Sequence, residues 1–221
     1  MGHEWDFSFL LDQRQFILGG LLGTLRLALT CVAAGMVLGL VFATMRLSRL
    51  AALRFLGTCY VEFFRNIPVL VQIFWCYFAL PILTGMQPNA YSAASIAVSL
   101  YAGAYLTEIF RSGIQSIETG QWEAARAIGF GYAGIMRNVV LPQAVRNVVP
   151  PMTSQVMEIV KTTTIASTIA YGEILYSAKV LSDQEFRPIE TYTAVGIVFI
   201  VMLALLSALS LLLERRLRRH V

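Results

Sequence analysis

Five long apolar runs constrain the fold of this 221-residue chain more than any other feature. A helix needs about 20 mainly apolar residues to cross the hydrocarbon core of a bilayer, which is about 30 Å thick. The runs of this length cover about residues 16–45, 58–83, 91–110, 148–178 and 192–213. Charged residues make up only 14% of the chain, whereas a soluble domain carries roughly a quarter. We therefore expect an all-α membrane protein with about five transmembrane helices.

The basic residues are distributed unevenly between the two sides of these spans. One side carries eleven arginines, in the loops after the first and third runs and in the tail: Arg46, Arg49, Arg54, Arg111, Arg126, Arg137, Arg146, Arg215, Arg216, Arg218 and Arg219. The other side carries only Arg14, Lys179 and Arg187 beside several acidic residues. Because cytoplasmic loops are enriched in lysine and arginine, we expect the N-terminus outside and the C-terminus in the cytoplasm. The arginine-rich tail is typical of a membrane flank, and we expect no nucleic-acid partner.

The longest stretch outside the spans, about residues 112–147, lies on the arginine-rich side. We expect Thr119 to cap a short helix that carries Glu123 in its first turn, where a carboxylate complements the helix dipole. Gly129 and Gly131 should end this helix, and a second short helix can start at Tyr132 and run to Val140. Two short helices joined by a glycine turn would form a compact knob, either folded against its own bundle or inserted into a partner.

Several motifs in this stretch and around it resemble those of ABC-importer permease subunits. Glu123-Ala124-Ala125 followed by Gly129, and then Leu141-Pro142, is similar to their EAA loop. Three further segments narrow the resemblance to the uptake family for polar amino acids of the histidine, glutamate and glutamine type: Tyr60–Gln72, Glu108–Ile117 and Lys161–Thr164. The resemblance extends from the first span to the arginine tail.

The resemblance implies a type I ABC importer permease fold forming a single transmembrane domain over residues 1–221 of a multi-pass protein of the bacterial inner membrane. The implied partners are a second permease subunit, identical or related, two ATPase subunits and an extracytoplasmic solute-binding protein. The chain itself would be no enzyme and hold no cofactor, because ATP and Mg would be bound by the ATPase. Glu123, Ala124, Ala125 and Gly129 would couple the permease to that ATPase, although Trp122 replaces the small or polar residue expected beside them.

Charged residues inside spans are costly and usually face a bundle interior, a partner or water. Glu62 and Arg65, and likewise Glu108 and Arg111, are three residues apart near the inner ends of the second and third spans. We interpret both as structural ion pairs. The fourth span carries a polar stripe that we interpret as a candidate translocation path, with a simple Glu158–Lys161 ion pair as the alternative: Glu158, Lys161, Thr162, Thr164 and Thr168.

The resemblance therefore implies an ATP-driven importer subunit that carries polar L-amino acids. The resemblance around Tyr60–Gln72 favours glutamate, aspartate or their amides. The alternative is a subunit of an ion-coupled secondary transporter, which would place paired sites at the interface of internal repeats, but no segment of this chain recurs. A P-loop motif is also absent from the sequence, so we expect ATP hydrolysis on a partner.

Overall fold

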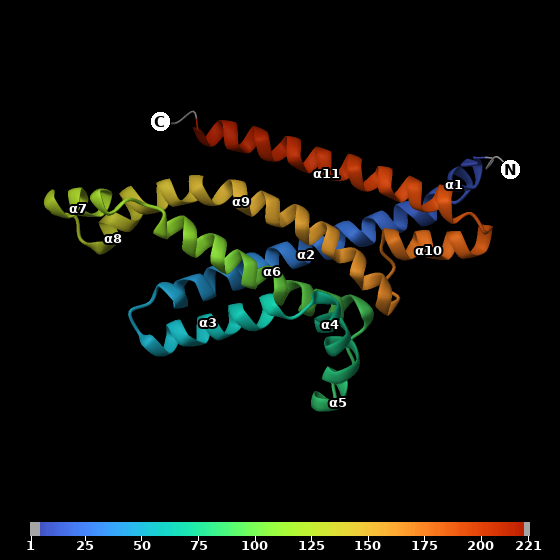
Figure 1. Cartoon of the computed structure of the whole chain (residues 1–221), viewed down its shortest axis with the longest axis horizontal. Helices are drawn as coiled ribbons and strands as arrows, with labels where there is room; N and C mark the ends of the chain where they lie inside the picture. Colours follow the sequence, from blue (N-terminus) through green and yellow to red (C-terminus); the bar gives the residue numbers. More distant parts are fainter. Residues whose placement is uncertain (1–4, 219–221) are drawn as a thin grey trace. The chain divides into compact units, whose positions relative to one another are not determined.

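The computed structural model describes residues 5–218, and every regular element in this range is a helix. Figure 1 shows these helices in their order along the chain, which divides into two compact units. Unit 1 contains the described residues up to Ala33, Pro68–Ser99 and Met157–Leu206. Unit 2 contains Ala34–Ile67, Leu100–Val156 and the described residues from Ser207 onward. Arg219, the last arginine of the tail, lies outside the described residues.

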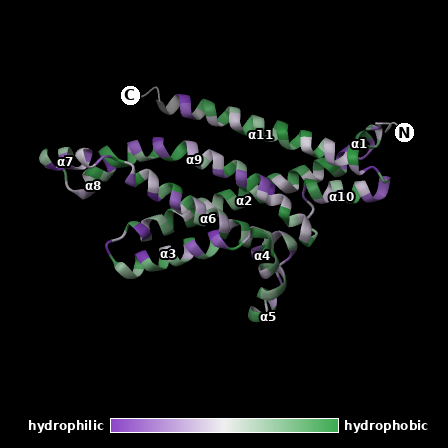
Figure 2. Cartoon of the chain, viewed as in Figure 1, coloured by the Kyte–Doolittle hydropathy of each residue, from purple (hydrophilic) through white to green (hydrophobic). Residues whose placement is uncertain are grey.

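Within residues 5–218, three helices are long and apolar enough to cross a membrane. They are α2 (Arg14–Leu47), α6 (Ala90–Gln115) and α11 (Pro188–Arg218). Figure 2 shows hydrophobic residues along most of α2 and α11. A continuous helix suits such a segment because lipid offers its backbone no hydrogen-bond partners, so N–H and C=O groups must pair within the segment. The first, third and fifth predicted spans are therefore confirmed as helices, each longer than expected.

The second predicted span is not one continuous helix, and this prediction was wrong. Helix α3 (Ala51–Asn66) ends before Ile67 and Pro68, which both have extended backbones. The residue before a proline is sterically pushed out of the helical region, so the helix stops there. After Pro68 the chain forms α4 (Val69–Phe74), the π-helical turn η1 (Trp75–Ala79) and α5 (Leu80–Thr84). Together these segments qualify at most as a broken span.

The fourth predicted span is also interrupted. Helix α9 (Leu141–Thr162) continues into the 3-10 helix η3 (Thr163–Ile169), which ends where Ala170 adopts a left-handed conformation. Helix α10 (Ile174–Glu185) follows after a short loop. Hydroxyls compete with the helical hydrogen bonds, and those of Thr163, Thr164, Ser167 and Thr168 all bond to the carbonyl three residues earlier. This segment is not among the helices that are apolar enough to cross alone.

Glycines bring helices close together within each unit. In unit 2, Gly35 and Gly39 of α2 lie against Ala102 and Leu106 of α6, and a Cβ at either glycine would fall 2.8 Å from the facing side chain. In unit 1, a Cβ at Gly23 would fall 2.3 Å from the carbonyl oxygen of Gly172. These contacts lie within the chain, so close intrachain packing accounts for Gly23, Gly35 and Gly39 of α2.

The short segment α1 (Ser8–Asp12) precedes α2, and the short helices α7 (Thr119–Ala127) and α8 (Tyr132–Ile135) lie between α6 and α9 along the chain. Two π-helical turns interrupt the helices, η1 and η2 (Met136–Val140). Each ends immediately before a Leu-Pro pair, Leu80-Pro81 or Leu141-Pro142. A proline within a helix removes one N–H donor and crowds the carbonyl four residues before it, and a widened turn relieves this crowding.

Candidate functional site

The segment Thr119–Val140, here called the knob, contains the residues that the EAA resemblance singles out. Helix α7 (Thr119–Ala127) is followed by a turn and α8 (Tyr132–Ile135), which runs through η2 into α9. Two local predictions were wrong. Glu118, not Thr119, is the N-cap of α7 and makes no side-chain cap. The second helix is not a separate short one, because η2 joins it to α9 without a break.

The knob has a hydrophobic core of its own. Its buried members come from the turn after α6 and from α7, α8 and η2, and they are Ile117, Ala125, Ile135 and Val140. Trp122 packs against this cluster, and its ring stacks on that of Tyr132 with the centroids 6.4 Å apart. Packing of this kind gives the segment a defined surface. The unexpected tryptophan thus stabilises the knob from its edge.

The outer surface of the knob carries three of the four predicted coupling residues. Glu123, Ala124 and Gly129 are exposed, whereas Ala125 is 3% exposed and belongs to the core. Ile128 and Phe130 on either side of Gly129 are also exposed, Ile128 to 74%. Exposed apolar residues around a small-residue helix are typical of a protein-binding surface. The sequence reasoning missed Ile128 and Phe130, although apolar residues beside a glycine in a polar loop were a usable signal.

Gly129 determines how α7 ends. Its backbone φ is +89°, a left-handed conformation that side chains other than glycine disfavour. The N–H of Gly129 donates to the carbonyl of Arg126 at 2.9 Å, and the N–H of Phe130 donates to that of Ala125 at 3.1 Å. These two bonds form a Schellman C-cap. A Cβ at Gly129 would meet nothing within 4 Å, so the position needs glycine for its backbone conformation and not for space.

The charged residues near the C-terminal ends of α3 and α6 have different partners. Nη2 of Arg111 lies 2.7 Å from Oε2 of Glu108, and Arg46 of α2 also pairs with this carboxylate. The expected pair Glu62–Arg65 does not form. Glu62 instead accepts a hydrogen bond from Asn66 at 3.1 Å, and the guanidinium of Arg65 lies 4.9 Å from the centre of the Tyr105 ring. The structure thus builds one three-residue charge cluster, in which the part of Arg46 was missed.

The candidate path residues lie in α9 and η3 of unit 1. Glu158 and Lys161 form an ion pair, and the side chain of each is about half exposed. Thr162 is buried, and its hydroxyl donates to the carbonyl of Glu158 at 2.8 Å. Thr168 is exposed and Thr164 is half-buried, and each bonds to its own helix backbone. Of these five residues, Glu158, Lys161 and Thr168 are exposed, Thr164 is half-buried and Thr162 is buried.

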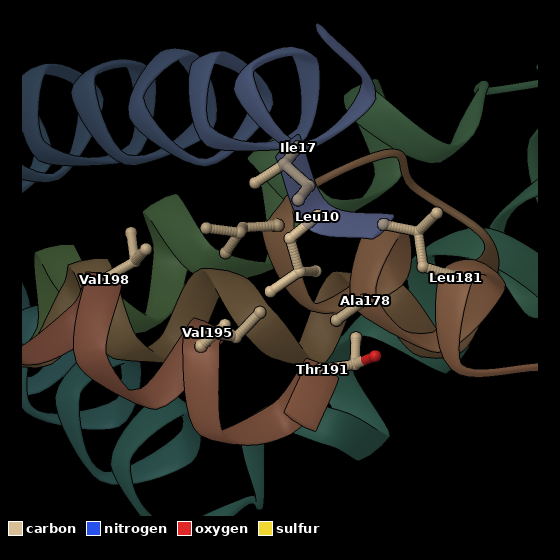
Figure 3. A pocket seen from close by; sticks show the side chains of 9 residues that line it. Leu10, Ile17, Ala178, Leu181, Thr191, Val195 and Val198 are labelled. Atoms are coloured by element: carbon tan, nitrogen blue, oxygen red, sulfur yellow. The ribbon is translucent and has the colours of Figure 1, made fainter. Parts of the chain in front are cut away.

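Unit 1 also contains an apolar pocket between α1, α2, α10 and α11 (Figure 3). Its lining is aliphatic except for one hydroxyl, and consists of Leu10, Ile17, Ile174, Ala178, Leu181, Thr191, Ala194, Val195 and Val198. A charged amino acid would lose its water there without gaining matching partners. This pocket is therefore unsuited to a polar amino acid.

Comparisons with known proteins identify the family. The family model described as "Binding-protein-dependent transport system inner membrane component" matches residues 35–219. The probable glutamine ABC transporter permease protein GlnM of Bacillus subtilis is 36% identical, over 97% of this chain and 99% of the relative. The arginine transport system permease protein ArtQ of the same organism is 32% identical, over 97% and 98%.

A solved structure agrees with these matches. The crystal structure of an amino acid ABC transporter with histidines has a chain that is 31% identical and superposes with a TM-score of 0.91, covering 97% of this chain and all of that one. The similarity thus extends over nearly the whole chain in both sequence and structure. The protein is a membrane-integral member of the binding-protein-dependent transport system permeases, in the amino-acid ABC transporter branch.

Proposed function

We propose that this chain is the membrane-spanning subunit of an ATP-driven importer of polar L-amino acids in the bacterial inner membrane. Glutamine and arginine, named in two relatives, and glutamate and aspartate, favoured by the sequence, are the first substrates to test. A partner ATPase would bind ATP and Mg, a solute-binding protein would deliver the substrate, and a second permease subunit would complete the pathway.

The observation that carries this proposal is the outer surface of the knob. Glu123, Ala124 and Gly129 are presented on a segment whose own core, including Ala125, holds it together. A rigid knob can transmit the motion of a docked ATPase, whereas a flexible loop would absorb it. Ile128 and Phe130 add apolar surface that a docked partner would cover. Docking here would couple ATP hydrolysis to transport.

Copurification and uptake test the proposal. The tagged permease should retain an ATP-hydrolysing subunit, and proteoliposomes of the complex with its solute-binding protein should take up labelled L-glutamine, L-glutamate or L-arginine only with ATP. Uptake that follows an ion gradient without ATP would support the secondary transporter and contradict the proposal.

A substitution on the knob surface sharpens the test. Ala124→Leu adds bulk to an exposed position, so it should leave the knob folded but lower retention of the ATPase about tenfold, a loss of about 1.4 kcal/mol. Ala52→Leu, at an exposed alanine of α3 outside the knob, is the matched control and should retain the ATPase normally. Equal retention by both variants would remove the knob from the docking site.

The orientation of the chain is part of the proposal. In a variant without the native cysteines, a single cysteine at Asp6 should react with an impermeant thiol reagent from outside the cell. A cysteine at Gln121 should not react until the membrane is opened. Labelling of position 121 from outside would place the knob on the wrong side for an ATPase.

A further inference from the structure

An arginine lies within the first membrane-spanning helix. Arg26 is about 18 Å along the axis of α2 from Arg14, at a rise of 1.5 Å per residue. The surrounding residues Leu25, Leu27, Ala28 and Leu29 are apolar. An ionisable residue inside a span is costly, and such residues commonly mark a substrate or ion pathway. The first question is therefore what stabilises this charge.

The structure holds Arg26 by an aromatic ring and not by a carboxylate. Its guanidinium lies 4.6 Å from the centre of the Tyr91 ring, at the start of α6. Among residues 5–218, neither an ion pair nor a side-chain hydrogen bond engages this guanidinium. A guanidinium over an aromatic ring is attracted by the charge distribution of the ring and needs no hydrogen-bond acceptor for this contact. Its in-plane N–H donors therefore remain available for a planar oxyanion, which is the geometry of a bidentate carboxylate contact.

The surroundings of Arg26 are fixed by hydrogen bonds. The hydroxyl of Tyr91 lies 2.7 Å from that of Thr30, which in turn donates to the carbonyl of Arg26 at 3.0 Å. The hydroxyl of Tyr171 donates to the carbonyl of Gly23 at 3.0 Å, and the rings of Tyr91 and Tyr171 are 5.7 Å apart. These bonds hold both rings in place, so the exposed guanidinium is supported on a preformed aromatic platform.

The same platform connects Arg26 to the candidate path. Tyr171 lies two residues after the end of η3, the segment that carries Thr164 and Thr168. Both η3 and Arg26 belong to unit 1. We infer that Arg26, supported by Tyr91, binds the α-carboxylate of the transported amino acid as it enters this unit. This inference deepens the proposed function and rests on it.

Equilibrium binding to the permease–ATPase complex, without solute-binding protein, tests the role of Arg26. The complex is placed in nanodiscs of phosphatidylcholine, and the probes are labelled L-glutamine and L-arginine. Arg26→Gln should weaken binding of the transported probe about tenfold, and Arg26→Lys should weaken it less because the charge remains. Arg14→Gln, which removes an exposed arginine at the start of the same helix, should bind normally.

A preference for ligands that carry the α-carboxylate distinguishes carboxylate binding by Arg26 from a general structural effect of the substitution. The wild-type complex should prefer L-glutamine over 4-aminobutanamide, or L-arginine over agmatine, since these analogues lack only the carboxylate. Arg26→Gln should abolish this preference. Tyr91→Leu should reduce it more than Tyr91→Phe, which keeps the ring and loses only the hydroxyl that bonds to Thr30. This provides a second pair of variants if Arg26→Gln does not assemble with the ATPase.

Three results would overturn the inference. The first is that Arg26→Gln keeps the preference for the ligand with the carboxylate over the analogue without it. The second is that Arg26→Gln loses binding only in nanodiscs that contain phosphatidylglycerol. The third is that the wild-type complex binds neither probe although it transports that probe. The second result would assign Arg26 to a lipid phosphate. Each of them leaves ATP-driven uptake intact, whereas failure of the proposed function would appear as absence of ATP-driven uptake by the wild-type complex.

Discussion

Replacement of Gly129 by alanine should weaken coupling through the backbone alone. The glycine has a φ of +89° and closes the C-cap of α7. An L-residue in a left-handed conformation costs about 1–2 kcal/mol relative to glycine. A Cβ at this position meets no atom within 4 Å, so steric overlap inside the chain adds nothing. The whole effect should come from the loss of the docking-competent turn.

The expected size follows from this free energy. If the turn must be formed before the ATPase docks, a cost of about 1–2 kcal/mol lowers the apparent affinity roughly 5- to 30-fold. Asparagine tolerates the left-handed region better than alanine, so Gly129→Asn should lose less affinity than Gly129→Ala. Gly129→Asp adds a charge to the docking surface and should uncouple transport from ATP hydrolysis while the protein stays in the membrane.

The assay is binding of the purified ATPase to the permease in nanodiscs, followed by uptake and ATPase rates in proteoliposomes. Gly131→Ala is the matched control, because Gly131 has a φ of −70° and open space around its Cβ. This control should behave as the wild type. The reasoning would be refuted if Gly129→Ala bound the ATPase normally, or if both alanine variants lost affinity equally.

Three further predictions concern packing and charge. Ala125→Leu should destabilise the knob by about 1–3 kcal/mol through overpacking. The measurement is amide hydrogen exchange in α7, which should become faster, and an unchanged exchange rate would contradict the burial of Ala125. Glu108→Gln should lower the thermal stability of the solubilised protein more than Arg111→Gln, because it leaves Arg46 and Arg111 together without their carboxylate; the reverse order would refute the cluster. If Glu158 and Lys161 line the translocation path, the double variant Glu158→Gln with Lys161→Met should show no uptake although it folds and binds the ATPase. If the two residues form only a structural ion pair, the double variant should take up more substrate than Lys161→Met alone.

The long helices could be predicted from the sequence because the signal is strong and local. Apolar runs of spanning length leave the backbone no alternative to internal hydrogen bonds in lipid, and α2, α6 and α11 follow them. The break at Pro68 had a local signal too, since proline restricts the preceding residue. Because the residues on both sides of Pro68 are apolar, they form one run of spanning length. The second span was therefore predicted as one continuous helix.

The candidate site was predictable only in part. The EAA resemblance located the knob, and the glycine at position 129 was correctly expected to end its first helix. Which alanine faces the core and which faces solvent was not predictable, because Ala124 and Ala125 are adjacent and identical in chemistry. Their assignment depends on Ile117, Ile135 and Val140, which only the folded knob brings to one side of α7.

The sequence by itself determined the class of this protein, its long helices and its family, because apolar run length and motif spacing are properties of neighbouring residues. Only the tertiary structure decided the partners of its charges. Arg46 meets Glu108 from another helix, and Arg26 rests on Tyr91. Such contacts join residues that are far apart in the sequence, and for Arg46 and Glu108 the close approach of Gly35 and Gly39 to α6 helps to set the distance between the two helices.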